Sequence, residues 1–138
     1  MKIKLFGFLL LSTLLFSTLL SAGNLHWEKD LQRAFDKATA NKLPLMVMVE
    51  SSSCRWCIKM KRRTLENRAI TTRLQNFVLV KINRDLVSSE FVPYAKYVPT
   101  IYFMTADKKI LESVTGYFNV SDFHSWIDDA ENKLKKAK

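Results

Sequence analysis

The chain holds its only two cysteines three residues apart, directly after a continuous apolar segment. Residues 43–49 read LPLMVMV, and an unbroken apolar run of this length is typical of a strand that is covered on both faces. Three serines follow, and we expect one of them to cap a helix that begins near Cys54 and continues to about residue 65. A buried strand that leads into a helix carrying Cys54 and Cys57 restricts the chain to folds that combine helices with a buried sheet.

The rest of the sequence supplies the other elements of such a fold. Apolar residues three and four apart predict an amphipathic helix over residues 27–40, with Asn41 in the left-handed conformation at its end. Further helices are predicted over 68–76 and, capped by Ser121, over 121–136, with strands at 77–83, 100–105 and 109–115. Residues 84–97 are expected to form a loop with a short helix. This order predicts a single α/β domain of three layers, α/β/α, with a mixed sheet.

Residues 1–23 have the features of a secretory signal peptide. Lys2 and Lys4 precede an apolar run over residues 5–20, and small residues at 21–23 offer a site for signal peptidase. The run is shorter and more polar than a spanning helix usually is. We therefore expect a cleaved signal at 1–23 and a folded, exported domain at 24–138 that is not stably inserted in the membrane. An uncleaved anchor is the alternative, and it also places the domain outside the cytoplasm.

The chain is basic, with a formal net charge of +9. Such a surface either is simply solvated or attracts an anionic partner or a membrane surface. Nucleic acid is not an expected partner, because no run of aromatic residues alternates with the basic ones at stacking spacing. No metal is expected either, because a structural zinc needs four ligands and the only histidines, His26 and His124, lie in different predicted helices. No nucleotide or flavin motif occurs, so we expect no cofactor beyond the cysteine pair itself.

The spacing of the cysteines suits a redox-active dithiol. A thiolate at a helix N-terminus meets the positive end of the helix dipole, which lowers the pKa of Cys54, and the charge of Arg55 acts in the same direction. Cys54 is then the attacking thiolate, and the deeper Cys57 resolves the mixed disulfide. A structural disulfide, half of a zinc site and two spectator thiols are the alternatives. A structural disulfide would close a very short loop and so stabilise little. A zinc site lacks further ligands. Spectator thiols are not expected in the oxidising compartment that an exported protein meets.

The chain resembles the thioredoxin superfamily, and more narrowly its small, signal-bearing periplasmic members. The resemblance runs from about residue 25 to 134 through KLPLMVMVE, SSSCRWCIKMK, VLVKINRD and YVPTIYFMTADKKIL. It implies a thioredoxin-like fold, periplasmic localisation, and thiol–disulfide oxidoreductase activity on protein thiols and disulfides. It also implies a cis peptide bond before Pro99 in the Val98-Pro99-Thr100 segment, so that the Val98 backbone can bind a substrate by strand-like hydrogen bonds.

Several residues depart from the family pattern. The family's buried acid falls on Met48, whereas Lys81 matches the buried lysine that usually pairs with that acid. Since Glu50 follows Met48 on the same face of the strand, we predict that Glu50 substitutes, pairing with Lys81 near Cys57; the alternative is a solvated acid at the end of the strand. The residues between the cysteines are Arg55 and Trp56, and we expect Trp56 to be an exposed docking surface.

The direction of electron flow stays open at this stage. Arg55 stabilises the thiolate and favours a more oxidising couple, whereas the resemblance implies a reductant, because many signal-bearing relatives of this size resemble reductants fed by a membrane electron carrier. We expect a monomeric reductant with such a membrane partner. The alternatives are a disulfide donor or isomerase, and a non-catalytic binding module that keeps the fold and uses its basic surface.

Overall fold

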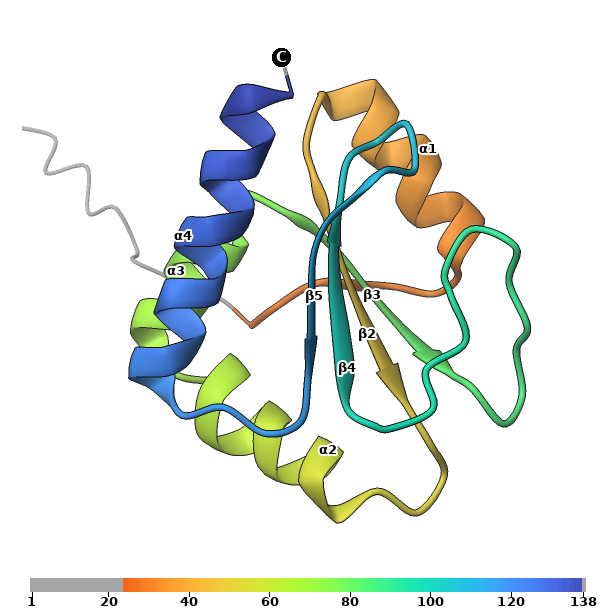
Figure 1. Cartoon of the computed structure of the whole chain (residues 1–138), viewed down its shortest axis with the longest axis vertical. Helices are drawn as coiled ribbons and strands as arrows, with labels where there is room; N and C mark the ends of the chain where they lie inside the picture. The colour runs from red at the N-terminus through yellow and green to blue at the C-terminus, as the bar shows by residue number, and fades with distance from the viewer. Residues whose placement is uncertain (1–23, 138) are drawn as a thin grey trace, which may run out of the picture.

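The computed structural model describes residues 24–137, which form a mixed sheet flanked by helices (Figure 1). The strand order is β1-β3-β2-β4-β5. β1, β3 and β2 are parallel, β4 is antiparallel to β2, and β5 is antiparallel to β4. The elements are β1 (Trp27–Glu28), α1 (Leu31–Asn41), β2 (Leu45–Glu50), α2 (Arg55–Met60), the π-helical η1 (Lys61–Leu65), α3 (Arg68–Leu74), β3 (Val78–Asn83), β4 (Thr100–Met104), β5 (Ile110–Thr115) and α4 (Val120–Lys136).

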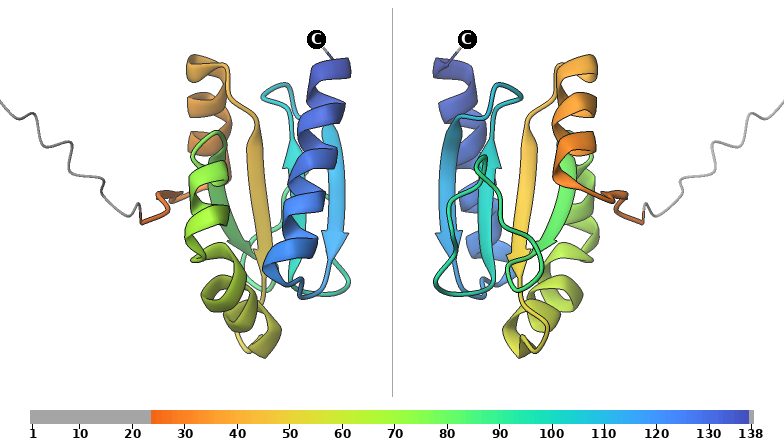
Figure 2. Two further views of the ribbon diagram at one scale, coloured as in Figure 1. Left: turned by 90° about the vertical axis from the view of Figure 1, so that its left-hand side faces the viewer. Right: turned by 90° about the vertical axis from the view of Figure 1, so that its right-hand side faces the viewer.

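Both faces of the sheet are covered, which explains the continuous apolar run of its central strand β2. Leu45, Val47 and Val49 belong to a core cluster with α1, whereas Met46 and Met48 belong to a second cluster with α2, η1, α3 and α4. The two views of Figure 2 show α3 and α4 in front of one face, and α1 with the segment between β3 and β4 in front of the other. The prediction of a three-layer α/β/α fold with a mixed sheet is confirmed.

The predicted start of the first helix is wrong. Trp27 and Glu28 pair with β3 as a short edge strand, and α1 begins only at Leu31. The reason is Asp30, whose backbone is extended and whose carboxylate accepts a hydrogen bond from the N–H of Arg33 as an N-cap. A hydrogen bond from the Lys37 ammonium lowers the pKa of the Glu28 carboxyl and ties the edge strand to α1.

Two predicted helix ends are displaced by one or two residues. The left-handed residue after α1 is Lys42, with φ 56°, and not Asn41, whose side-chain amide donates to the carbonyl of Lys37. The cap of α4 is Asn119 and not Ser121, because the Asn119 carboxamide oxygen accepts from the backbone N–H three residues on. At both helix ends, neighbouring polar side chains compete to hydrogen-bond the backbone groups, and the sequence does not show which of them will do so.

Residues 84–99 contain no helix, contrary to the prediction. Carbonyl groups of Ala95 and Lys96 in this segment accept hydrogen bonds from the Arg84 guanidinium and not from helical N–H groups. Val92 and Ala95 are buried over the same face of the sheet as α1, so the segment completes the cover of that face without regular structure.

The predicted signal at residues 1–23 lies outside the described residues. Among the helices of residues 24–137, none has the length and apolar character that a bilayer crossing requires.

Phe103 on β4 joins the sheet to the helices of one face. It is fully buried, and its ring lies 5.6 Å from that of Phe77 and 6.1 Å from that of Phe123 on α4. Phe103→Ala is expected to lower the free energy of unfolding by about 3–5 kcal/mol, because the cavity would lie in a packed core. Urea denaturation measures this loss. Ile110→Ala on β5 is the matched control, since Ile110 is exposed, and an equal effect of the two changes would contradict the packing.

Candidate active site

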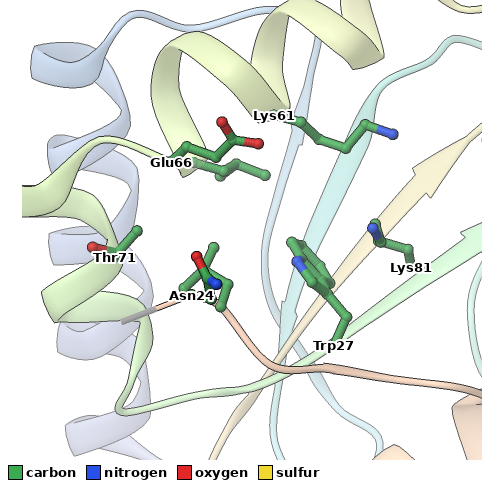
Figure 3. Close-up of a pocket in the computed structure, with 8 residues that line it drawn as sticks. Asn24, Trp27, Lys61, Glu66, Thr71 and Lys81 are labelled. Atoms are coloured by element: carbon green, nitrogen blue, oxygen red, sulfur yellow. The ribbon is translucent and has the colours of Figure 1, made fainter. Parts of the chain in front are cut away.

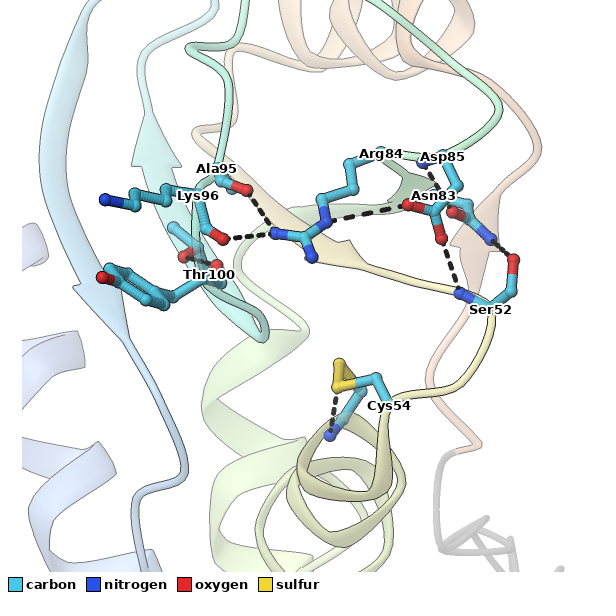
Figure 4. Close-up of polar contacts among 10 residues, drawn as sticks. Ser52, Cys54, Asn83, Arg84, Asp85, Ala95, Lys96 and Thr100 are labelled. Atoms are coloured by element: carbon cyan, nitrogen blue, oxygen red, sulfur yellow. Dashed lines mark hydrogen bonds and ion pairs between the residues drawn. A yellow bond between two sulfur atoms is a disulfide. The ribbon is translucent and has the colours of Figure 1, made fainter.

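The two cysteines form a disulfide at the start of α2, which follows the central strand β2 after a short loop (Figure 4). Cys54 itself is the N-cap of α2, in place of the expected serine, and its Sγ accepts a hydrogen bond from the Cys57 N–H at 3.0 Å. Cys54 is half-buried, whereas Cys57 is almost fully buried. The arrangement leaves the first sulfur reachable and shields the second, and the hydrogen bond to Sγ is one that would strengthen if Cys54 were a thiolate.

A pocket of about 310 Å³ adjoins the disulfide. Its walls come from the end of β2, the loop before Cys54, the first turns of the helix and the end of β3, and they comprise Glu50, Ser51, Ser52, Cys54, Cys57, Ile58, Lys61 and Asn83. Glu50 is the only carboxylate in this wall. It therefore lies near both cysteines, as the sequence predicted for an acid at this end of β2.

The predicted partner of Glu50 is wrong. The carboxylate accepts a hydrogen bond from Lys61 at 2.7 Å, whereas the ammonium of Lys81 lies 4.8 Å from the ring centroid of Trp27. Lys61 lies four residues after Cys57 and so faces β2 from the same side of the helix. That helical spacing was the signal in the sequence that could have identified it.

Lys81 belongs to a separate cavity of about 250 Å³, between the first described residues and the helices (Figure 3). Trp27 and Lys81 form one side of this cavity and Glu66 and Thr71 another. Met48, which stands at the position of the family's buried acid, is fully buried and is paired in register with Lys81. An apolar residue thus stands beside Lys81 in place of the acid, and the ion pair of this chain is instead Glu50–Lys61, in the wall of the cysteine pocket.

The segment before β4 lies at the end of the sheet from which the chain runs to the cysteines, because Thr100 is paired in register with Val49 of β2. The peptide bond between Val98 and Pro99 is cis. The Pro99 carbonyl accepts from the N–H of Gly116, and the Thr100 hydroxyl donates to the Tyr97 carbonyl at 2.7 Å. Thr100 and Pro99 are buried, so their role is to hold the segment in place. Within the described part of the chain, the Val98 backbone makes no hydrogen bond, which leaves it available to a substrate.

Arg84 holds the backbone of Ala95 and Lys96, just before Val98. Its guanidinium donates to the carbonyl oxygens of Ala95 at 2.7 Å and Lys96 at 2.6 Å, and its Nε lies 3.8 Å from the carboxylate of Asp85 (Figure 4). Hydrogen bonds from a charged group to two adjacent carbonyls fix both the position and the direction of the backbone.

The loop before Cys54 is attached to the same place. The Ser52 N–H donates to the carboxylate of Asp85 at 3.0 Å, and the Asn83 amide donates to the Ser52 hydroxyl at 3.1 Å. Residues 83–85 therefore connect the cysteine loop with the segment before Pro99. The sequence analysis missed this connection. The usable signal was a polar run, Asn-Arg-Asp, at the carboxyl end of a parallel strand beside β2.

The residues between the cysteines are exposed. Arg55 points to solvent, and 52 % of the surface of Trp56 is accessible, in agreement with the predicted exposure. The Trp56 ring nevertheless lies beside that of Tyr117, with the ring centroids 6.0 Å apart. Trp56 is thus held in a defined place while it remains accessible.

The histidines take no part in this site. His26 contacts Glu28, and His124 on α4 contacts Arg73 on α3. Across residues 24–137, no group of three or more His, Cys, Asp or Glu side chains is placed to hold a metal ion.

With this geometry established, sequence comparison identifies the family. A thioredoxin-like family model matches residues 26–106, which is more than half of the chain. The chain belongs to the thioredoxin-like family. The match includes both cysteines and the Val98–Pro99–Thr100 segment.

Curated relatives of this thioredoxin-like chain are distant. An uncharacterised protein of Caenorhabditis elegans is 33 % identical over 103 residues, which are 66 % of this chain but 14 % of that protein. Anterior gradient protein 2-B of Xenopus laevis is 23 % identical over 117 residues, which are 83 % of this chain and 71 % of that protein. The chain therefore spans only a small part of the nematode protein and most of the frog one.

Solved structures share the fold. A DsbH oxidoreductase superposes with a TM-score of 0.66 at 19 % identity, covering 85 % of this chain and 91 % of the other. A thioredoxin of Thermus thermophilus superposes with a TM-score of 0.64 at 20 % identity, covering 77 % and 86 %. The family and the superpositions together give this chain a thioredoxin-like fold that carries the Cys54–Cys57 disulfide at the start of α2.

Replacing Arg84 should separate substrate docking from thiol reactivity. Arg84→Gln removes two charge-assisted hydrogen bonds to the segment before Pro99, each of a kind that contributes about 1.5–3 kcal/mol. We expect KM for a protein disulfide to rise several-fold, while iodoacetamide alkylates Cys54 of the reduced variant at the wild-type rate. Arg68→Gln, an exposed position on α3, is the control. A parallel loss of alkylation would show that Arg84 acts on the cysteine and not on docking.

Proposed function

We propose that this chain reduces protein disulfides in the periplasm through the Cys54–Cys57 dithiol and is itself re-reduced by a membrane electron-transfer partner. One observation carries the proposal: the disulfide lies at the start of α2 with Cys54 reachable and Cys57 shielded, and the Val98 backbone, at the same end of the sheet, makes no hydrogen bond within residues 24–137. An attacking sulfur, a resolving sulfur and a strand-like edge for the substrate are the three parts that disulfide exchange with a polypeptide requires.

The reaction proceeds by two exchanges of sulfur partners. The Cys54 thiolate attacks one sulfur of the substrate disulfide, forming a Cys54–substrate bond and releasing the other substrate sulfur as a thiolate, which takes up a proton. The Cys57 thiol then loses its proton and attacks the Cys54 sulfur, which breaks the mixed disulfide and releases the second substrate thiolate. The substrate gains two electrons and two protons, and Cys54–Cys57 is left as the disulfide.

Glu50 is the base that we assign to the second exchange. It is the carboxylate in the wall of the cysteine pocket, and its hydrogen bond from Lys61 keeps it in that wall. In the mixed disulfide, Cys57 is a thiol that must lose its proton inside a partly closed site, where water is less available. Lys61 balances the charge of Glu50 before the transfer and stabilises the developing thiolate after it.

The compartment and the redox partner rest on the sequence and on the character of similar proteins. The basic, apolar and small-residue segments over residues 1–23 are those of a signal peptide. One structure of similar fold is a periplasmic thioredoxin of Paracoccus pantotrophus, and another is the C-terminal domain of DsbD of Neisseria meningitidis. A dithiol in an oxidising compartment stays reduced only if electrons are supplied to it, which is why a membrane partner is part of the proposal.

A disulfide donor is the second candidate, and Arg55 is the observation that favours it. A positive charge beside Cys54 stabilises the thiolate, and each pKa unit makes the couple about 30 mV more oxidising. A redox titration of Cys54–Cys57 against glutathione and dithiothreitol separates the candidates. A potential near about −270 mV supports the reductant, whereas one near about −120 mV would assign the chain to disulfide donation.

Loss of Cys54 should abolish activity completely. The wild-type domain is expected to accelerate insulin reduction by dithiothreitol, and Cys54→Ser to be as slow as the uncatalysed reaction, because only this sulfur is accessible to a substrate. Turbidity of the released insulin chain is the readout. Cys57→Ser should instead accumulate mixed disulfides, detectable by mass spectrometry. An inert wild type would favour the binding-module alternative.

Loss of the Glu50 carboxylate should slow only the second exchange. For Glu50→Gln we expect resolution of a Cys54 mixed disulfide to be about 10- to 100-fold slower at pH 7, because the local base is absent. The difference should narrow above the ordinary cysteine pKa of about 8.5, where solvent removes the proton without help. Quenched-flow measurement of thiol release gives the rate. Glu66→Gln at the end of η1 is the matched control, and an unchanged pH profile in Glu50→Gln would remove Glu50 from the mechanism.

A further inference from the structure

The helix that begins at the cysteines carries an uncompensated basic stripe. Arg55, Lys59, Arg62 and Arg63 follow one another along α2 and η1 and are all exposed. None of the four forms an ion pair with an acid of residues 24–137. The sequence contains no Asp or Glu from residue 51 to residue 65. The stripe, defined as these four residues, is therefore a surface of net positive charge that starts beside the reactive sulfur.

Aromatic rings hold part of this charge in a fixed position. The ammonium of Lys59 lies 4.8 Å from the ring centroid of Trp56 and 4.3 Å from that of Tyr117. Trp56 and the neighbouring Ile58 are about half exposed. A positioned cation next to accessible apolar surface suits a polypeptide segment that combines carboxylates with apolar side chains.

The segment before Pro99 repeats this chemistry. Lys96 and Tyr97 immediately precede Val98 and are exposed, with the Lys96 ammonium 5.5 Å from the Tyr97 ring centroid. The acids nearest the cysteines are already engaged. Glu50 is bound by Lys61, and Asp85 accepts the Ser52 N–H. Positive charge is thus present both on the helix that begins at Cys54 and in the segment that leads to Val98.

We propose that the basic stripe selects the substrates of the dithiol: it binds disulfides whose flanking sequence is acidic, and so directs the chain to acidic protein partners. This rests on the proposed disulfide-reductase function and deepens it. Complementary charge raises the rate of encounter and orients the partner before any bond is exchanged. The stripe begins one residue from Cys54, so a segment bound along it enters the site with its disulfide close to the attacking sulfur.

A protein partner fits this surface better than an anionic membrane does. The stripe and Trp56 follow Cys54 along the helix, and the exposed Lys96 and Tyr97 directly precede the open backbone of Val98. A bilayer bound to this face would cover the sulfur and leave the Val98 edge with no strand to pair with. An acidic polypeptide occupies the charged surface and the backbone edge at the same time.

Three peptides that share one disulfide loop and differ only in flanking charge test the proposal. We expect the reduced wild-type domain to react with the Glu-flanked peptide about 10-fold faster than with the Lys-flanked one, with the Gln-flanked peptide between them. The ratio should fall as salt rises from 20 mM to 500 mM, because exposed charges are screened beyond about 10 Å at 0.1 M and over less distance at higher salt. Stopped-flow measurement of thiol release gives the three rate constants.

Two variants of equal charge assign the preference to the stripe. Lys59→Gln/Arg62→Gln/Arg63→Gln should bring the ratio of the Glu-flanked to the Lys-flanked rate close to one, whereas Lys29→Gln/Lys135→Gln/Lys136→Gln, on other exposed surface, should preserve it. Equal loss in both variants would mean a general effect of net charge and would overturn the proposal.

The remaining outcomes separate this proposal from the function on which it rests. If the wild type reduces none of the peptides, the reductase function itself fails. If it reduces all three at one rate, the reductase stands and the selection by charge is overturned. Sedimentation with phosphatidylglycerol vesicles tests a membrane as the alternative partner. If the wild type binds the vesicles, the triple variant of the stripe does not, and the peptides show no preference, the stripe binds a membrane.

Discussion

The site depends on β2 being buried on both faces. Because Leu45, Val47 and Val49 pack under α1 while Met46 and Met48 pack under the opposite helices, this strand is fixed in position and register between β3 and β4. β2 ends at Glu50 and α2 begins just after Cys54, so this short connection fixes the position of the Cys54 sulfur relative to the core. The substrate edge at Val98 leads into β4, the neighbour of β2, and is held relative to the cysteines by the same packing.

The sequence predicted those parts of the fold that follow from periodicity. Strands such as β2 and β3 are recognisable because burial on both faces requires a continuous apolar run. Helices are recognisable because burial of one face requires apolar residues three and four apart. What escaped prediction depends on competition between nearby polar groups. Trp27 and Glu28 pair with β3, although the helical spacing of apolar residues in α1 extends back to them. Before Pro99, hydrogen bonds from Arg84 hold the carbonyls of Ala95 and Lys96 where a short helix was predicted. Such choices are made by tertiary contacts that no local pattern encodes.

For Glu50, the sequence predicted the position but not the pairing. Glu50 does reach the cysteine pocket, as its position on β2 requires, yet its partner is Lys61 from the helix and not Lys81 from the neighbouring strand. Burial explains the exchange. With Met48 in place of the family's acid, the register partner of Lys81 on β2 is a buried apolar residue, and the Lys81 ammonium lies over the ring of Trp27. A carboxylate costs less at the rim, where solvent still reaches it, than in the core.

The positive charges around the cysteines divide into two groups by distance. Arg55 is adjacent to Cys54 in sequence, so its charge acts on the sulfur directly. At a rise of about 1.5 Å per residue, Arg63 lies about 13 Å further along the helix than Cys54. Since the Debye length is about 8 Å at physiological salt, the far end of the stripe barely acts on the sulfur. Those outer charges act on whatever binds there, so substrate choice can change without altering the redox couple.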